Sequence, residues 1–176
     1  DSLRKSAIDT EWRPFNSGSA FEIAELRIQP FSVPHDAADP VGFVISSANS
    51  SLGILTDLGY ATRQIIHAVQ GVNALVIETN HDEALLQNDT KRPWSVKQRI
   101  LSRHGHLSNQ AAAKLVADIA TENLRHILLA HLSEDCNSPS LASEAIRSQF
   151  STSGIPTPEI HCPGHPPHPL PHSIQL

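Results

Sequence analysis

Residues 108–132, SNQAAAKLVADIATENLRHILLAHL, contain the two adjoining patterns that decide the fold. The first part has apolar side chains at the three- and four-residue spacing of one helical face, and Ser108 stands where a helix N-cap is expected. The second part, residues 126–132, is a nearly continuous apolar run, which is typical of a buried strand. A helix followed at once by a buried strand indicates a layered α/β domain. The apolar residues of the helical face are Ala112, Leu115, Val116 and Ile119.

The alternation of strands and helices continues on both sides of this stretch. Residues 74–79 (ALVIET) are a second apolar run and predict another buried strand. Residues 21–33 alternate between apolar and polar side chains, which predicts a strand with Pro30 at an edge or a bulge. The other expected elements are a hairpin of strands over 42–47 and 53–56, a helix over 61–70, and a helix that opens at residues 137–139.

The bulk composition is that of one globular domain. The chain has 176 residues, of which 39% are hydrophobic, enough for one core. A net charge of -5 disfavours binding of nucleic acid through overall charge, although it leaves room for a local basic strip. No apolar run is long enough to span a bilayer, and two cysteines make no disulfide framework. We therefore expect a cytoplasmic protein with no membrane partner.

Composition also divides the chain into three parts. Residues 1–20 are polar and mixed, and we expect them to form an N-terminal segment ahead of a domain over 21–150. Residues 151–176 hold seven prolines and four histidines, and this Pro/His-rich tail is expected to be disordered. The chain does not begin with Met and contains none, which favours a fragment or a processed product.

Three polar residues follow predicted strands at equivalent positions: His35, Asp57 and His131. In α/β sheets, ligands are held at the carboxyl ends of strands, because rigid strands aim short loops into one crevice. Imidazole and carboxylate groups together suit zinc or manganese, and the carboxylate of Asp57 has two oxygens with which to bridge two cations. A single histidine after a strand is more often a hydrogen-bonded structural residue, so this prediction depends on all three residues.

Two further segments bring polar residues close to this expected site. Glu78, His81 and Asp82 lie at and after the end of the second apolar run. His106 precedes the helix that Ser108 caps, and the N-terminus of a helix favours an anion such as phosphate. From the residues alone, the simpler interpretation is that Ser108 is only an N-cap and His106 a solvent-exposed neighbour.

The segment from Lys91 to His104 has five basic residues and no acidic residue. In a chain of net negative charge, this asymmetry indicates a contact with a phosphate backbone. A solvated helix face with Trp94 buried explains the same pattern equally well, and the sequence leaves both interpretations open.

Five segments form a larger pattern when they are taken together. They are PFSVPHDAADPVGFVI (30–45), LGILTDLGYAT (52–62), LVIETNHDEALL (75–86), RILSRHGHLSNQAAAKL (99–115) and ILLAHLSEDCNSPSLA (127–142). In order and spacing, these segments resemble the WalJ/YycJ-like branch of the metallo-β-lactamase superfamily. The resemblance implies a four-layer αββα sandwich, represented here mainly by its C-terminal half. It also implies a two-metal hydrolase that cleaves phosphodiester bonds, with DNA as the nucleic-acid partner.

The resemblance also assigns roles to single residues. His35 matches a metal-binding histidine, Asp57 the aspartate that bridges both metals, and His131 a histidine on the second metal. His106 matches a histidine that related phosphodiesterases keep near the scissile phosphate, so His106 and Asp57 are the expected catalytic residues. The residues of a motif typical of this branch, expected to support the metal ligands or to contact the substrate, are Glu78, His81 and Asp82.

The sequence departs from the family at one motif. The His-x-His-x-Asp-His run that supplies the family's other four metal ligands does not occur, and His165-Pro-Pro-His168 lacks its aspartate and stands at the wrong end. The resemblance therefore implies two divalent ions, zinc or manganese, in a complete relative and a partial site in this chain. We expect a phosphodiesterase or DNA exonuclease; the alternative is a non-catalytic fragment that keeps a partial metal site. Half of a sandwich also leaves an apolar sheet face uncovered, so we expect homo-oligomers.

Overall fold

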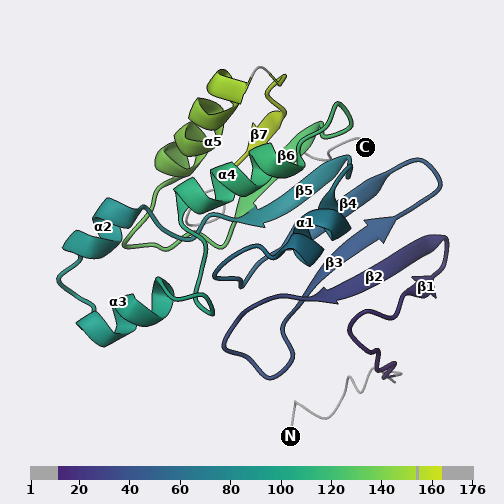
Figure 1. Ribbon diagram of the computed structural model, residues 1–176, viewed down its shortest axis with the longest axis horizontal. Coiled ribbons are helices and arrows are strands. Elements are labelled where there is room, and N and C mark those ends of the chain that lie inside the picture. The colour runs from purple at the N-terminus through teal and green to yellow at the C-terminus, as the bar shows by residue number, and fades with distance from the viewer. Residues whose placement is uncertain (1–11, 154, 164–176) are drawn as a thin grey trace, which may run out of the picture.

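The computed structural model describes residues 12–153 and 155–163, which form one seven-stranded sheet with helices beside it. The strands are β1 (Phe21–Ile23), β2 (Leu26–Ser32), β3 (Val41–Ser46), β4 (Ser51–Leu55), β5 (Ala74–Glu78), β6 (His126–Ala130) and β7 (Glu159–His161). They lie in the sheet in chain order, so each strand pairs with its neighbour in sequence. β1 to β4 pair antiparallel and β4 to β7 pair parallel (Figure 1). The α/β class expected from the sequence is confirmed.

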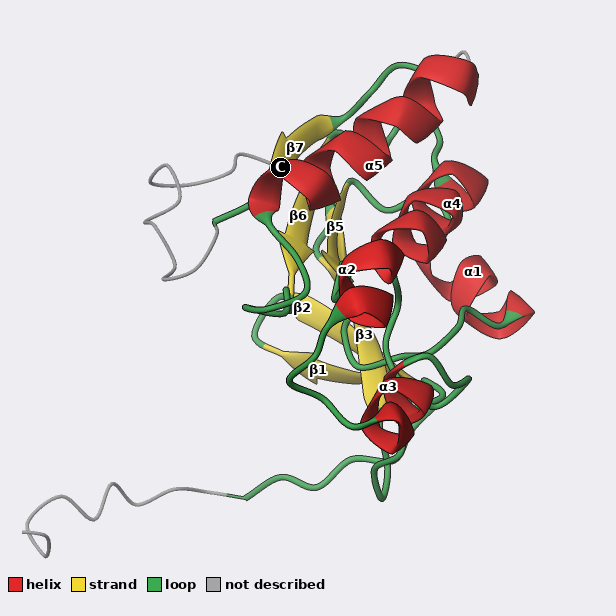
Figure 2. Cartoon of the chain, turned by 90° about the vertical axis from the view of Figure 1, so that its left-hand side faces the viewer, coloured by secondary structure: helices red, strands yellow, loops and turns green. Residues whose placement is uncertain are grey.

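The helices are α1 (Arg63–Val69), α2 (Glu83–Asn88), α3 (Trp94–Ile100), α4 (Asn109–Ile119) and α5 (Pro139–Ser153). Helices α1, α4 and α5 pack on one face of the sheet, and α2 and α3 lie beyond the carboxyl ends of its strands (Figure 1 and Figure 2). The Ser108 hydroxyl accepts a hydrogen bond from the backbone N–H of Ala111, so Ser108 caps α4 as its position predicts. None of the helices in the described ranges combines the length and the apolar character that crossing a bilayer would require.

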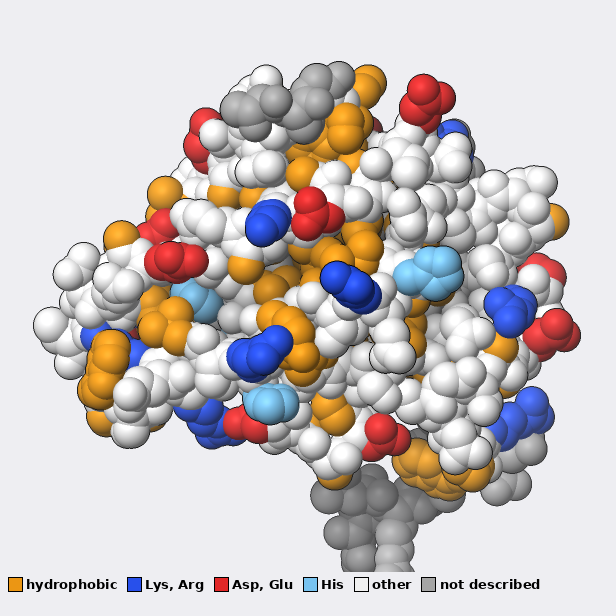
Figure 3. All heavy atoms as spheres, in the orientation of Figure 1, with side chains coloured by type: hydrophobic (Ala, Val, Ile, Leu, Met, Phe, Trp, Pro, Cys, Tyr) orange, Lys and Arg blue, Asp and Glu red, His pale blue; other side chains and the backbone are white. Residues whose placement is uncertain are grey.

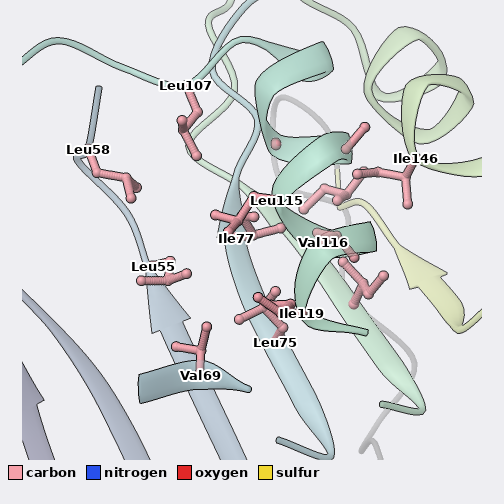
Figure 4. Close-up of a cluster of buried hydrophobic side chains, with 14 of the residues drawn as sticks. Leu55, Leu58, Val69, Leu75, Ile77, Leu107, Leu115, Val116, Ile119 and Ile146 are labelled. Carbon is pink, nitrogen blue, oxygen red and sulfur yellow. The ribbon is translucent and has the colours of Figure 1, made fainter. Parts of the chain in front are cut away.

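The main core lies between the sheet and the helices α1, α4 and α5 (Figure 4). Leu55, Ile77 and Leu129 pair across β4, β5 and β6 and form one fully buried row on the helical side. Burying a side chain of this size contributes about 1.5–3 kcal/mol, so this layer accounts for much of the stability. The residues that α4 packs against the row are Ala112, Leu115, Val116 and Ile119, which are those expected from the periodicity.

The opposite face of the sheet is apolar too, but no described helix covers it (Figure 2). Side chains that alternate with the core rows point to this side and are half-buried. Phe15 contacts Phe43 on this side, with ring centroids 5.9 Å apart. We call it the open sheet face, and its members are Phe43, Ile45, Leu52, Ile54, Val76 and Leu128.

The structure differs from the expected elements at both ends of the domain. The strand expected over 21–33 is two antiparallel strands, because the chain turns at Ala24, whose φ is 50°. α5 continues to Ser153, and β7 lies inside the segment expected to be a disordered tail. β7 forms because Ile160 packs against the core while its backbone pairs with β6. Residues 1–11 and 164–176 of the two expected terminal segments lie outside the described residues.

Candidate metal centre at the carboxyl ends of the strands

One edge of the sheet receives the loops that carry the predicted site residues. β4, β5 and β6 are parallel, so Asp57, Glu78 and His131 come to the same edge. β2 runs antiparallel to β3, which runs antiparallel to β4, so the loop after β2 brings His35 to this edge as well. His106 reaches it from the turn before α4. The strand-end rule applied to the sequence therefore predicts where these side chains meet.

The side chains of these residues face one another across a few ångströms. The Oδ1 atom of Asp57 lies 3.6 Å from Nδ1 of His131 and 3.7 Å from Nε2 of His35. Ligand-type atoms of Asp57, Glu78, His106 and His131 all lie within 4.8 Å of one another. The His106 ring stands between the rings of His35 and His131, with centroid distances of 5.0 and 5.1 Å. Two carboxylates and three imidazoles thus surround one small volume.

The backbone at two of these residues is left-handed. Asp57 and His131 both have a φ of 57°, a region that non-glycine residues seldom occupy. Among the described non-glycine residues, only Ala24 shares it. Such strain persists where the surrounding structure fixes the backbone, and it concentrates at functional sites. Asp and His adopt this conformation more often than other non-glycine residues do, so both residue types suit the backbone that the fold imposes here.

Glu78 is the central acceptor of the cluster and is 0% exposed. Its carboxylate accepts hydrogen bonds from the backbone N–H groups of Asp57, Leu58 and Leu107, and a 2.8 Å hydrogen bond from Nδ1 of His106. Burial alone would raise the pKa of Glu78, but hydrogen bonds from His106 and His131 outweigh it and hold the pKa below its usual value. An ionised Glu78 consequently ties the Asp57 loop to the His106 loop.

Hydrogen bonds also decide which histidine nitrogens are available. Nδ1 of His35 lies 3.0 Å from the carbonyl oxygen of Gly105, which can only accept, so Nδ1 donates this hydrogen bond and Nε2 is the nitrogen that faces Asp57. Nδ1 of His106 donates to Glu78, which leaves its Nε2 free. The hydrogen bond with Glu78 raises the pKa of His131 above its ordinary value, against the opposing effect of burial.

Two glycines allow the loops to come this close. A Cβ atom on Gly59 would lie 2.3 Å from the carbonyl oxygen of Ser102, and one on Gly105 would lie 2.1 Å from that of Ile100. Neither contact is with a flexible side chain, so a larger residue would push the His106 loop away from Asp57. Sequence reasoning missed this requirement, because the backbone that approaches each glycine is known only from the fold.

His81 and Asp82 lie next to the cluster but play other parts in the structure. The Asp82 carboxylate accepts a hydrogen bond from the backbone N–H of Leu85 and caps α2. His81 is only 1% exposed, and neither of its ring nitrogens has a hydrogen-bond partner among the described residues. Burial lowers the pKa of His81. Neither side chain is brought into the group formed by Asp57, Glu78, His106 and His131.

The basic segment over 91–104 is largely engaged within the chain. Arg92 pairs with Asp89 and Asp135, Lys91 also pairs with Asp135, and Arg99 pairs with Asp36. Trp94, expected to be buried if this were a simple helix face, is 61% exposed. On the helical side of the molecule, basic and acidic side chains alternate with apolar ones (Figure 3). The excess of basic residues in the sequence is therefore offset by acids that other segments supply.

A cavity of about 210 Å³ opens beside the cluster. It is lined by His35 and His106 and by residues of helix α3, among them Arg99. A second hollow on the other side of His106 reaches His131, Arg92 and Asp135. His106 thus separates two solvent-accessible depressions, and ligands could approach the cluster from either one.

The chain is similar in sequence to known proteins. Residues 2–131 match the family model of the β-lactamase superfamily domain. The chain is 37% identical over 141 residues to exodeoxyribonuclease YycJ of Bacillus anthracis, covering 80% of this chain and 53% of that protein. It is 31% identical over 141 residues to exodeoxyribonuclease WalJ of Streptococcus pneumoniae, covering 80% of this chain and 52% of that protein. The chain thus spans about half the length of the curated relatives it matches.

Solved structures share the fold at low sequence identity. The metallo-β-lactamase fold protein YhfI from Bacillus subtilis aligns with a TM-score of 0.62 and 14% identity, over 84% of this chain and 50% of that one. The Zn²⁺-bound PqqB from Methylobacterium extorquens aligns with a TM-score of 0.59 and 19% identity, over 90% and 56% respectively. With a sheet of this topology and a family model matched over most of its length, the chain belongs to the metallo-β-lactamase superfamily.

Proposed function

We propose that this chain contributes the C-terminal half of the active site of a metal-dependent phosphodiesterase that acts on DNA. The observation that carries the proposal is the convergence of His35, Asp57, His106 and His131 around one volume, with Glu78 buried behind them. The two relatives named above are exodeoxyribonucleases, which supports DNA as the substrate. Cys136 and Cys162 form no disulfide, which fits a reducing compartment such as the cytoplasm.

The residues present fit a divalent metal ion. Carboxylate and imidazole donors are those that zinc and manganese use, and the hydrogen bond of Nδ1 to Gly105 turns Nε2 of His35 toward Asp57. His35, Asp57 and His131 would hold the metal, with Asp57 at the centre because its Oδ1 faces both histidines. When bound, divalent cations activate water and neutralise phosphate oxygens.

The remaining residues of the site hold its loops in position or transfer a proton to the substrate. Glu78 orients His106 through a 2.8 Å hydrogen bond and fixes the backbone N–H of Asp57. In this proposal His106 takes up a second proton on Nε2 and transfers it to the departing oxygen of the phosphodiester, while Nδ1 keeps its hydrogen bond to Glu78. His81 and Asp82 support the loop from behind, since His81 is buried and Asp82 caps α2.

A second candidate function is metal binding without catalysis. It is favoured by one specific observation: the His-x-His-x-Asp-His motif is not in this sequence. In this case the chain would bind one divalent ion at His35, Asp57 and His131 but would not hydrolyse DNA.

The two candidates are separated by measuring metal content and DNA cleavage on the same samples. The chain alone and the chain joined to the N-terminal half of the Bacillus anthracis relative are each loaded with Mn²⁺ or Zn²⁺ and given end-labelled DNA. Cleavage by the joined protein that disappears in Asp57→Asn supports the phosphodiesterase. Metal binding with no cleavage in a joined protein that is folded by circular dichroism would leave only the second candidate.

A further inference from the structure

A second group of metal-binding side chains lies at the amino end of β6, away from Asp57. His126 opens β6, and Glu159 and His161 are the first and last residues of β7. In the parallel register His126 lies opposite Glu159, and Leu128 lies opposite His161, so all three side chains point to the open sheet face. His131 follows five residues later, about 16 Å at the rise of a strand, so the two groups are separate.

The distances among the three side chains match a coordination shell. Nε2 of His161 lies 3.4 Å from Nδ1 of His126. The Glu159 oxygens lie 3.5 Å from Nδ1 of His126 and 3.7 Å from Nε2 of His161. The oxygen near His126 is Oε2 and the oxygen near His161 is Oε1. Ligands at ~2.0–2.1 Å from a tetrahedral zinc ion are ~3.3 Å from one another, so the two nitrogens have this spacing and each lies within a few tenths of an ångström of it from one oxygen of the Glu159 carboxylate.

The surroundings suit a cation that is both held and accessible. The side chains of His126 and His161 are 16% and 8% exposed, whereas that of Glu159 is 66% exposed. Two imidazoles and one carboxylate are a ligand set that binds zinc and similar transition ions. Cys162 follows His161, but its side chain points to the opposite side of the sheet and packs against the helical core. The thiol is therefore not a ligand, and water or another group would fill the fourth coordination position.

We propose that His126, Glu159 and His161 bind a divalent transition-metal ion, zinc in the first instance, which joins β7 to β6. β7 is three residues long and has only β6 as a strand neighbour in the described sheet. His126 and His161 are 35 residues apart in the chain, so the three ligands come together only in the folded protein, and the free energy of binding the ion stabilises the folded state. The ion thus acts as a structural clamp on the edge of the sheet, independently of the proposed hydrolytic site.

Zinc titration of the whole chain is monitored by imidazole ¹H–¹⁵N correlation spectra, which give a separate signal for each histidine. The Asp57→Asn background removes the other candidate site. In that background we expect the His126 and His161 signals to shift together as zinc is added. Glu159→Gln should weaken zinc affinity at least about tenfold, the lower end of the loss seen when even a supporting residue of a metal site is removed. Glu159 is exposed, so this variant is expected to fold.

Two controls make the outcome decisive. Glu144→Gln, at an exposed position of α5, should leave zinc affinity unchanged. Replacing His165, His168 and His172 together by Ala removes the other histidines of the C-terminal segment, and zinc should still shift His126 and His161. The proposal is overturned if these two signals stay fixed at saturating zinc, or if binding depends on the three later histidines and not on Glu159. A hydrogen-bonded cluster without a metal would give the first of these results.

Discussion

Asp57 and His131 lie on loops after β4 and β6, face each other at 3.6 Å between Oδ1 and Nδ1, and share a backbone φ of 57°. Neither residue is a glycine, so the two loops carry strain at the two positions that point into the cluster. The side chains are therefore placed by the backbone before any ligand arrives, which reduces the ordering that binding would require.

The strain predicts a difference between two replacements of Asp57. Both Asp57→Gly and Asp57→Ala should lose metal binding at this site, because both remove the carboxylate. Only glycine accepts a positive φ freely, so the Gly variant should be more stable than the Ala variant by about 1 kcal/mol. Urea denaturation together with metal titration measures both effects. Equal stabilities would show that residue 57 is not left-handed in solution.

Glu78→Gln should disturb the cluster without leaving a cavity. The buried carboxylate accepts four hydrogen bonds, and an amide replaces one accepting oxygen by a donor that faces other donors. Loss of such contacts typically costs about 1–3 kcal/mol, and metal affinity should fall about 10- to 100-fold. Denaturation and metal titration test this, with the exposed Glu122→Gln as the matched control. An unchanged affinity would remove Glu78 from the positioning role.

His106→Ala should separate catalysis from metal binding in the protein joined to the N-terminal half of the relative. Loss of a proton donor lowers turnover about 10²- to 10⁴-fold, while the metal content stays that of the unaltered protein. Asp57→Ala should lose metal and turnover together. If His106→Ala strips the metal, His106 is a ligand. Unchanged turnover would mean that it is only a neighbour of the α4 cap.

The buried His81 should make the protein less stable in mild acid. Burial lowers the pKa of His81 in the folded state, so below the unfolded pKa of about 6.5 the unfolded chain takes up a proton that the folded one resists. Stability from this residue is thus full above that pH and falls as the pH drops through and below it. Denaturation between pH 7.5 and 5.5 should show a shallower loss in His81→Leu. Parallel curves for both proteins would refute the assignment.

The open sheet face should drive self-association. Half-buried apolar side chains at its centre, such as Ile54, have no covering helix among the described residues, and contiguous apolar patches promote association. Sedimentation should detect oligomers that Ile54→Lys reduces. Leu85→Lys, at an exposed apolar position on α2, should not reduce them. A monodisperse monomer with a cooperative melt would contradict this prediction.

The sequence predicts those helices and strands whose apolar residues form a continuous run or recur at a regular spacing. The apolar runs at 74–79 and 126–132 became β5 and β6, and the helical spacing from Ser108 became α4. α2 was missed because Asp82 was assigned to a site motif, whereas its carboxylate caps the helix. β7 was missed because three alternating residues among prolines give too short a signal.

In the candidate site, too, some residues could be predicted from the sequence and others could not. His35, Asp57 and His131 could be selected because each follows a strand, and strand ends share an edge of the sheet. The central place of Glu78 could not, because its hydrogen-bond donors come from segments more than twenty residues away on either side. The pairing of Arg99 with Asp36 is equally non-local. The sequence of the basic segment therefore does not show that an acidic residue from another part of the chain neutralises Arg99.

The strand order has a consequence for how the molecule is assembled. From β2 onward, every strand of the described sheet pairs with its predecessor in the chain, so these seven strands can be added to the sheet one after another as the polypeptide leaves the ribosome. No later strand must be threaded between two earlier ones, so each intermediate already has the final topology of the strands it contains.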